Sequence, residues 1–553
     1  MAPRHPQTES RIETRIDPDP EFGFKRTIMS IVSFRRHRLG YALILVALGF
    51  CSSRSHAAVR LHPTFSDHAV LQQGIRVPIW GTADEGEAVT VEFGGQRHRT
   101  VARQGRWMVE LSRMRASRNG ADLRVSGPAN QAVIHDVVVG EVWVCSGQSN
   151  MEWPMRASHQ PETDIAASAN SNLRLFTVTK RRSPTLLADL DYASHGWVLS
   201  APDAVRGFSA VGYYFGRSLE AALRDQGIPV GIIHTSWGGS PAEVWMRDDV
   251  LKADREYSTN IVATAAESLA KWEKAVQGWE ERKNAAAAKG EAFRENRPGQ
   301  PWRPSELYNG MLANIIPYGI QGAIWYQGES NAGRAWQYRR LFADMIRNWR
   351  QAWGQGDFAF LAVQLAPWDR NRKRDMGVIA AEIGESDWAE LREAQNHVAE
   401  VLPNVDVAVI TDVGDKDDIH PTKKAPVGDR LARLALANVY GSRIIAHGPR
   451  FRSLAVRGSE AVLKFRDVGQ SLRTLDGHMP SGFTMAGNDR KFHPAVARIT
   501  GPDEITVTSA GVSEPVAVRF GWNDYPVVNL ANASFLPASP FRTDDWPVTT
   551  QSK

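Results

Sequence analysis

Cysteine is nearly absent from this chain of 553 residues, which contains only Cys51 and Cys145. Cys51 lies in a segment that we expect to be removed, so the mature chain would carry a single thiol. A single thiol excludes an intramolecular disulfide and suggests no cysteine metal site. Cys145 lies in an apolar run, and we expect it to be an unreactive residue of the core.

Long hydrophobic runs are scarce as well. The apolar run near the N-terminus covers only residues 39–50, whereas a membrane-spanning helix needs about 20 apolar residues. Basic residues 35–38 precede this run and a small-residue cleavage site at 55–57 follows it, which is the pattern of a signal peptide. We therefore interpret residues 1–57 as a leader whose true start is Met29. An uncleaved N-terminal anchor is the alternative.

This leader predicts an exported protein, periplasmic or secreted, with no stable membrane span after cleavage. It also accounts for most of the positive charge, since residues 1–57 hold nine Arg and Lys against five Asp and Glu. The net charge of the whole chain is +5, so about one positive charge remains outside the leader. We find no basic patch that needs a nucleic-acid partner, in spite of a pI near 9.1.

Three regions follow the leader. Residues 58–136 contain short alternating runs, such as 76–80 and 88–93, separated by turn residues, and they predict an N-terminal β-domain. Residues 137–446 alternate apolar strands with helical periodicity and predict a central α/β domain. Residues 447–553 return to short strands and predict a C-terminal β-region. We describe both flanking regions as β-sandwich or jelly-roll-like.

The central region is expected to form a parallel sheet covered by helices on both faces, because its strands are almost continuously apolar. Between its strands, the charged and alanine-rich residues 252–304 predict a helical insertion, most simply a solvated hairpin. The expected strands are 141–145, 230–235, 322–326, 358–364 and 407–410, and the expected helices are 208–224, 336–353, 388–402 and 427–439.

A serine follows the first of these strands, in the small polar turn Gly147-Gln148-Ser149-Asn150. Open α/β sheets hold their ligands at the carboxyl ends of strands, which makes Ser149 a candidate nucleophile. Taken alone, such a serine is more often a helix cap. Near the last strand, Asp417 or Asp418 precedes His420 on one loop, which is how a base and its orienting carboxylate are supplied to a serine.

The remaining strand ends provide candidate hydrogen-bond donors for an oxyanion. Gly238 and Gly239 follow the second strand and allow backbone N–H groups to approach a ligand closely. Gln327 and Asn331 follow the third strand, and either side-chain amide could donate. Nucleophile, base and donors together are the parts that acyl transfer requires.

Four segments resemble the signature motifs of the sialate O-acetylesterase family, a branch of the SGNH hydrolases. They are GEVWVCSGQSNMEWPM (140–155), WGGSPAEVW (237–245), WYQGESN (325–331) and DIHPTK (418–423). The resemblance covers essentially the whole mature chain. It implies an SGNH-like, flavodoxin-like α/β fold with flanking β-regions, and the activity of a carbohydrate O-acetylesterase.

The resemblance also assigns roles to individual residues. Ser149 matches the family's nucleophile and His420 its base, while Gly238 or Gly239 matches the second-block glycine of the oxyanion hole, to which the N–H of Ser149 would also contribute. The third block departs from the common pattern, so Gln327 is preferred to Asn331 without excluding it. Asp-x-x-His spacing places Asp417 ahead of Asp418 as the triad acid.

The predicted reaction is a two-step serine hydrolysis that removes O-acetyl groups from acetylated sialic acid or from plant cell-wall glycans such as xyloglucan or xylan. It requires no metal and no cofactor, and its partner is the acetylated glycan. We assign Trp153, Trp237 and Glu329 to substrate binding, because they lie in the same motifs and tryptophan suits stacking on sugar faces.

Two other functions remain open from the sequence. The β-regions are also compatible with a non-catalytic exported carbohydrate-binding protein. An α/β-hydrolase-type lipase or esterase would need Gly-x-Ser-x-Gly, but Met151 occupies the position of the final glycine. The sequence predicts no oligomeric state.

Overall fold

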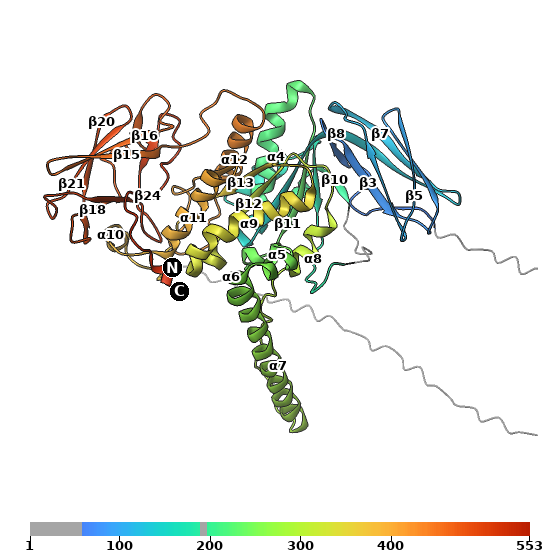
Figure 1. The fold of residues 1–553 in the computed structure, drawn as a ribbon, viewed down its shortest axis with the longest axis horizontal. Coiled ribbons are helices and arrows are strands. Elements are labelled where there is room, and N and C mark those ends of the chain that lie inside the picture. The colour runs from blue at the N-terminus through green and yellow to red at the C-terminus, as the bar shows by residue number, and fades with distance from the viewer. Residues whose placement is uncertain (1–57, 188–195, 553) are drawn as a thin grey trace, which may run out of the picture. The chain divides into compact units, whose positions relative to one another are not determined.

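The computed structural model describes residues 58–187 and 196–552, so the predicted leader, with Met29 and Cys51, lies outside the described residues. The described residues form one compact unit. The fold is mixed α/β, with one large mixed sheet and additional β-structure on either side in the chain (Figure 1). Within the described part of the chain, no helix has both the length and the apolar character needed to cross a bilayer.

The N-terminal region is built from strands, as predicted. Most of these strands alternate buried and exposed residues because they cover a core on one face only. The strands are β1 (Arg60–Leu61), β2 (Val70–Gln72), β3 (Val77–Thr82), β4 (Ala88–Phe93), β5 (Gln96–Val101), β6 (Arg106–Leu111) and β7 (Ser117–Ser126).

The next strand, β8 (Gln131–Gly147), joins the N-terminal region to the central sheet. Its first half pairs with β7, and its second half, residues 141–147, lies between two parallel strands. The domain boundary predicted between residues 136 and 137 therefore falls inside a continuous strand. The apolar run that leads to the Gly147–Asn150 turn is anchored in both regions.

The central sheet has the strand order β10-β9-β11-β8-β12-β13-β14. All neighbours from β9 to β14 are parallel, and only the edge strand β10 is antiparallel. The bounds are β9 (Asn170–Thr177), β10 (Trp197–Ser200), β11 (Val230–Ser236), β12 (Gly322–Tyr326), β13 (Ala359–Val363) and β14 (Val405–Ala408).

The predicted strands of this sheet all form, with small shifts. β9 was missed because polar residues interrupt its apolar pattern, and β10 was missed because it is only four residues long. The last strand begins two residues earlier than predicted, at Val405. Its polar residue Asp406 is tolerated in the strand because its carboxylate lies 3.0 Å from His447 Nε2 and accepts Nδ2 of Asn438 at 2.8 Å.

Two helix pairs cover the two faces of the sheet (Figure 1). α4 (Ala210–Leu223) packs on α12 (Ala425–Asn438), and their apolar side chains share one core with the sheet. On the other face α9 (Ala335–Trp353) packs on α11 (Asp387–Val401). These four helices match the predicted ones to within two residues at each end.

Shorter helices occupy the connections of the sheet. They are α1 (Ser149–Glu152), η1 (Met155–Ala157), α2 (Pro161–Ala166), α3 (Pro202–Arg206), η2 (Arg224–Gln226), η3 (Ala242–Trp245), α8 (Glu306–Gly310), η5 (Leu312–Asn314), η6 (Glu329–Arg334) and α10 (Met376–Ala380).

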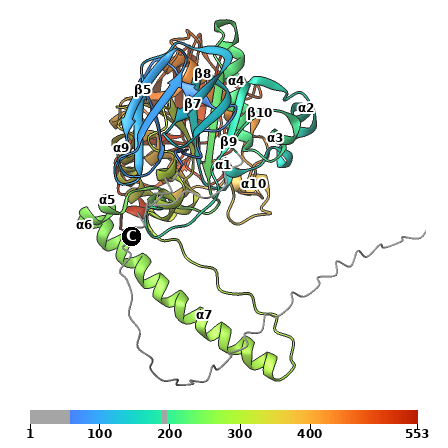
Figure 2. The same ribbon diagram turned by 90° about the vertical axis from the view of Figure 1, so that its right-hand side faces the viewer.

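The predicted insertion contains one long helix. After α5 (Asp248–Ala253), α6 (Arg255–Tyr257) and the π-helical η4 (Ser258–Ala263), α7 (Thr264–Ala288) extends away from the sheet (Figure 2). Residues 291–303 return without helix, so the insertion is a helix with an extended return segment and not a helical hairpin. Trp272 donates its indole N–H to Pro298 O, at 3.0 Å, and thereby ties the return segment to α7.

The C-terminal region folds around a core of its own. Its sheets have the orders β15-β16-β21-β20, β19-β18-β22-β24 and β17-β23. The buried Arg392 of α11 donates to the carbonyl groups of Asn523 and Asp524, both at 2.7 Å, and so fixes this region to the central one.

The elements of this region are β15 (Arg450–Arg457), β16 (Glu460–Arg466), β17 (Leu472–Thr474), β18 (Phe483–Ala486), β19 (Phe492–Pro494), β20 (Val496–Gly501), β21 (Glu504–Thr508), β22 (Ala517–Phe520), β23 (Leu530–Asn532), β24 (Phe541–Arg542) and η7 (Thr549–Ser552).

Candidate active site

Ser149 lies at the first position of α1, directly beyond the carboxyl end of β8. The turn depends on Gly147, whose φ is +141° and whose missing side chain would lie 2.1 Å from the carbonyl oxygen of Tyr326. Glycine at this position therefore allows β8 and β12 to approach each other at the strand ends. The seven residues before Gly147 are buried, whereas Ser149 is partly exposed.

A histidine and a carboxylate approach this serine from a distant loop. His420 Nε2 lies 2.9 Å from Ser149 Oγ, and His420 Nδ1 lies 3.5 Å from Asp418 Oδ1. The same Asp418 oxygen accepts the backbone N–H of His420 at 2.9 Å, which fixes the loop. Trp153 stacks on the imidazole with 5.2 Å between ring centroids. This arrangement places a base against a hydroxyl and a carboxylate behind the base.

Asp417, ranked first from its spacing, does not contact the imidazole. Its carboxylate accepts the backbone N–H of Lys373 at 2.7 Å and pairs with the ammonium of Lys416 at 2.6 Å. These contacts hold the side chain on the outer side of the loop. The geometry therefore favours Asp418, because a tight turn brings the residue two positions before His420 back under the ring.

Backbone donors face the nucleophile from the loop after β11. A Cβ on Gly238 would lie 3.3 Å from Ser149 Cβ, so glycine is what allows this loop to approach the serine. The N–H of Gly238 donates to Glu152 Oε2 at 2.6 Å. The N–H groups of Gly239 and Ser149 donate to no group among the described residues, which leaves them available to an oxyanion.

The two predicted side-chain donors, Gln327 and Asn331, form hydrogen bonds with other groups of the protein. The amide nitrogen of Gln327 donates to Asn331 Oδ1 at 2.7 Å and to Ser240 O at 3.3 Å. The amide nitrogen of Asn331 donates to Glu243 Oε2 at 3.0 Å. Both side chains are buried, and both N–H groups of the Gln327 amide are already used, so the preference for Gln327 over Asn331 does not match the geometry.

The three predicted substrate-binding residues lie in different environments. Trp153 packs on His420, as described above, and Trp237 is half-buried against Trp302 and the ammonium of Lys180. Glu329, in contrast, accepts Nδ2 of Asn150 at 2.6 Å through Oε1, and its Oε2 is buried. The carboxylate of Glu329 is therefore bonded to Asn150, and its role in substrate binding stays a prediction.

The site contains two residues that sequence reasoning missed, Asn150 and Lys424. Lys424 is 1% exposed, and its ammonium donates to Asn150 Oδ1 at 2.5 Å. Burial lowers the pKa of Lys424 to about 7. The sequence does point to both residues by their positions. Asn150 directly follows Ser149, and Lys424 directly follows the DIHPTK motif that contains His420.

The electrostatics of the site favour a neutral imidazole. Burial lowers the pKa of His420 below its usual value, the ammonium of Lys424 acts in the same direction, and Asp418 opposes both. A neutral imidazole is the form that accepts a proton from a serine. Among the described residues, no group of three His, Cys, Asp or Glu side chains is placed to hold a metal ion.

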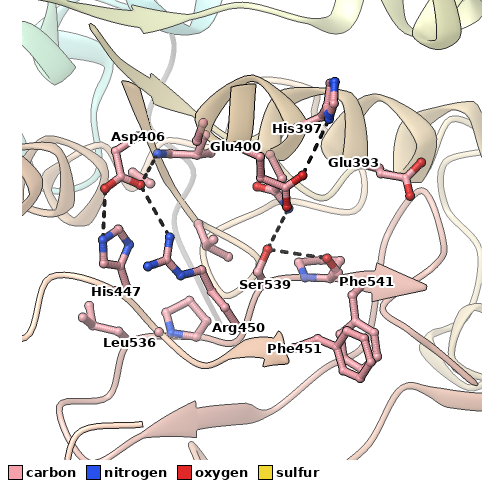
Figure 3. A pocket seen from close by; sticks show the side chains of 18 of the residues that line it. Glu393, His397, Glu400, Asp406, His447, Arg450, Phe451, Leu536, Ser539 and Phe541 are labelled. Atoms are coloured by element: carbon pink, nitrogen blue, oxygen red, sulfur yellow. Dashed lines mark hydrogen bonds and ion pairs between the residues drawn. The ribbon is translucent and has the colours of Figure 1, made fainter. Parts of the chain in front are cut away.

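A cavity of about 510 Å³ elsewhere in the molecule does not compete as the active site (Figure 3). It lies between α11, β14 and the C-terminal region, far in sequence from Ser149. Its charged side chains are paired with one another, as in Asp406 with His447 at 3.0 Å. No described serine, threonine or cysteine in its lining adjoins a histidine base.

Comparison with known proteins gives matches over most of the chain. The sequence model of a family described as carbohydrate esterase, sialic acid-specific acetylesterase, matches residues 285–437. The sialate O-acetylesterase of Mus musculus is 27% identical over 544 residues, which cover 91% of this chain and 97% of the mouse protein. The sialate O-acetylesterase of Homo sapiens is 25% identical, with coverages of 84% and 88%.

One solved structure is also similar over most of its length. The crystal structure of a novel carbohydrate acetylesterase from Xanthomonas citri is 36% identical to this chain and superposes with a TM-score of 0.74. The match covers 88% of this chain and 100% of the other.

Proposed function

Because this chain belongs to the sialate O-acetylesterase family and is a carbohydrate O-acetylesterase, we propose that it cleaves acetyl esters through an acetyl-enzyme on Ser149. The observation that carries this proposal is the distance of 2.9 Å between Ser149 Oγ and His420 Nε2. A serine hydroxyl is a weak nucleophile until an adjacent base takes its proton.

The reaction proceeds in two steps. In the first, His420 accepts the proton of Ser149 while Oγ attacks the acetyl carbonyl carbon, and the imidazolium then protonates the sugar oxygen as its bond to the carbonyl carbon breaks, which releases the sugar alcohol. In the second, His420 takes a proton from the water that attacks the acetyl-serine, and the imidazolium returns that proton to Ser149 Oγ as the bond between Oγ and the acetyl carbon breaks and acetate leaves. Asp418 orients the imidazole and stabilises its charged form.

The oxyanion that forms in each step is stabilised by backbone donors. The N–H groups of Ser149 and Gly239 are the free ones at this site, and removing one such donor typically costs roughly 10²–10³ in turnover. The hydrogen bond from Gly238 to Glu152 keeps the glycine loop beside the serine.

The strand order supports an SGNH-like catalytic domain. With β9 and β10 set aside, the order β11-β8-β12-β13-β14 is 2-1-3-4-5 in chain order, which is the flavodoxin-like arrangement. In such sheets the ligand site lies where the order reverses, beside the first strand. Ser149 follows this strand.

The substrate is proposed to be an O-acetylated carbohydrate, either acetylated sialic acid or a plant glycan such as xyloglucan or xylan. The names of the curated relatives support the first class. Trp153 and the half-buried Trp237 lie beside the nucleophile and offer aromatic surface for a sugar.

Acetate release from acetylated sialic acid, acetylated xylo-oligosaccharides and acetylated xyloglucan tests this function. We expect release from at least one of the three with wild type, loss by more than about 10³-fold in Ser149→Ala, and no change in Ser171→Ala, which removes an exposed hydroxyl of β9. Unchanged release by Ser149→Ala would refute the proposal.

We also propose that the protein is exported to the periplasm or the medium, on the basis of residues 35–57. The N-terminus of the protein recovered from the periplasm and the medium tests this. A start at Ala58 supports cleavage and export, whereas recovery of all the protein from the cytoplasm with residues 35–57 intact argues against it.

A further inference from the structure

Directly behind the nucleophile lies a buried polar cluster that the two-step reaction does not use. It consists of Asn150, Glu329 and Lys424, and we call it the Asn150 cluster. Nδ2 of Asn150 donates to Glu329 Oε1 at 2.6 Å, and its Oδ1 accepts the ammonium of Lys424 at 2.5 Å. The side chain of Asn150 is fully buried.

The cluster joins three segments that carry the predicted catalytic parts. Asn150 follows the nucleophile in α1, Glu329 begins η6 after β12, and Lys424 precedes α12. Nδ2 of Asn150 also donates to the carbonyl oxygen of Ile419 at 3.0 Å, which is the residue before His420. One side chain thus ties the serine turn to the histidine loop.

Burying these polar groups costs stability, because they lose their contacts with water. A buried ammonium loses its hydration, and here it has one recorded hydrogen-bond acceptor, with the rings of Trp153 and Tyr326 at 5.7 and 5.5 Å. Trp153 in turn stacks on His420, so the ammonium of Lys424 and the imidazole contact the same indole ring.

We propose that the Asn150 cluster sets the distance between Ser149 and His420, and that Lys424 is a positioning residue of the esterase. This inference rests on the proposed function, since it assigns the cluster to the Ser149–His420 pair. None of its three side chains needs to touch the substrate, because each acts through the serine turn, the histidine loop or the field at the imidazole.

The charged groups around His420 give this proposal a measurable signature. Asp418 lies on its own loop, Lys424 lies at the start of α12, Glu329 of η6 faces Lys424, and Glu152 of α1 is paired with Lys180. Of these, Lys424 lowers the pKa of His420 and Asp418 raises it.

These pKa shifts determine in which direction the acid limb of the pH profile moves when Lys424 is replaced. The rate rises with pH as His420 loses its proton, and the acid limb lies below the ordinary value of 6.5 because its pKa is lowered. The pKa of Lys424 is about 7, so its ammonium is mostly charged where His420 titrates. Removing this charge therefore moves the acid limb to higher pH.

The test compares Lys424→Met with Lys423→Met in purified full-length protein. Methionine keeps the length and the apolar packing of Lys424 but removes the ammonium, and Lys423 is an exposed lysine next to it. For Lys424→Met we expect kcat about tenfold lower, KM within about twofold of wild type, and an acid limb of kcat/KM at higher pH. We expect Lys423→Met to match wild type.

A second variant covers the possibility that Lys424→Met does not fold. Asn150→Ala removes the link to Ile419, and we expect kcat to fall about 10–100-fold with KM nearly unchanged. The proposal is wrong if the acid limb of a folded Lys424→Met does not move, or if Asn150→Ala retains wild-type kcat. If instead Ser149→Ala retains esterase activity, the proposed function itself is wrong, and this inference is wrong with it.

Discussion

Ser149 is partly exposed because of the residues that precede it in the chain. The residues before it form a buried apolar strand, and Gly147 lets that strand end against β12 with no side chain between the two backbones. The serine is therefore delivered to the sheet edge by a rigid element, while His420 arrives on a loop. The loop is fixed through Asp418, Trp153 and Asn150, which explains how a base on an irregular segment is held to a nucleophile 271 residues away.

The choice between two adjacent aspartates is decided at this scale. We expect Asp418→Asn to lower kcat by about 10²–10⁴-fold, because the imidazole loses the carboxylate that orients and stabilises its charged form. Asp417→Asn is the matched control. It should change kcat by less than about threefold, since the carboxylate of Asp417 contacts the ammonium of Lys416, in an exposed ion pair, and the backbone N–H of Lys373.

Steady-state kinetics on a soluble acetyl ester give the comparison, with thermal unfolding of each variant to confirm that it folds. A larger loss in Asp417→Asn than in Asp418→Asn would show that the loop rearranges when substrate binds, and would overturn the assignment of Asp418.

At the scale of elements, the sheet concentrates the chemistry at one edge. Parallel strands place all their carboxyl ends together, so the segments after β8, β11 and β12 meet around Ser149 although they are far apart in sequence. The long helix α7 takes no part in this arrangement. Its only buried residue is Val276, and its indole and guanidinium groups bond to its own return segment, as Arg282 does with Glu295.

Shortening this insertion tests whether it contributes to the reaction. Replacing residues 274–296 by a short Gly-rich turn keeps Trp272 and Pro298, which are already in contact. We expect the unfolding temperature to stay within a few degrees of wild type and kcat/KM on a small acetyl ester to be unchanged, because little apolar surface is lost. A loss of activity on the small ester in a folded variant would place α7 in the catalytic machinery.

At the scale of the whole molecule, the sequence predicts the elements better than it predicts their contacts. Apolar runs and 3.6-residue periodicity locate four helices and most of the central strands within about two residues. β9 escapes this approach because it is polar at intervals, and β10 because it is short, while β8 runs across the predicted boundary at 136 because it pairs in two regions.

The same limit applies to the site. Motifs identify Ser149 and His420, because nucleophile and base are characteristic residue types in characteristic turns. They do not distinguish Asp417 from Asp418, since rotating one loop residue exchanges an inward for an outward carboxylate. They also do not reveal that Gln327 and Asn331 are buried against Ser240 and Glu243, because this depends on packing between distant segments.

The central claim is that the imidazole of His420 activates the hydroxyl of Ser149. Labelling with a fluorophosphonate, which forms a covalent bond with activated serines, followed by peptide mapping, measures this most directly. We predict one label per chain on Ser149 in the wild type, parallel loss of esterase activity, and labelling of His420→Ala slower by more than about 10²-fold. A label on another residue that abolishes activity, or equal labelling of Ser149 in His420→Ala, would contradict the account.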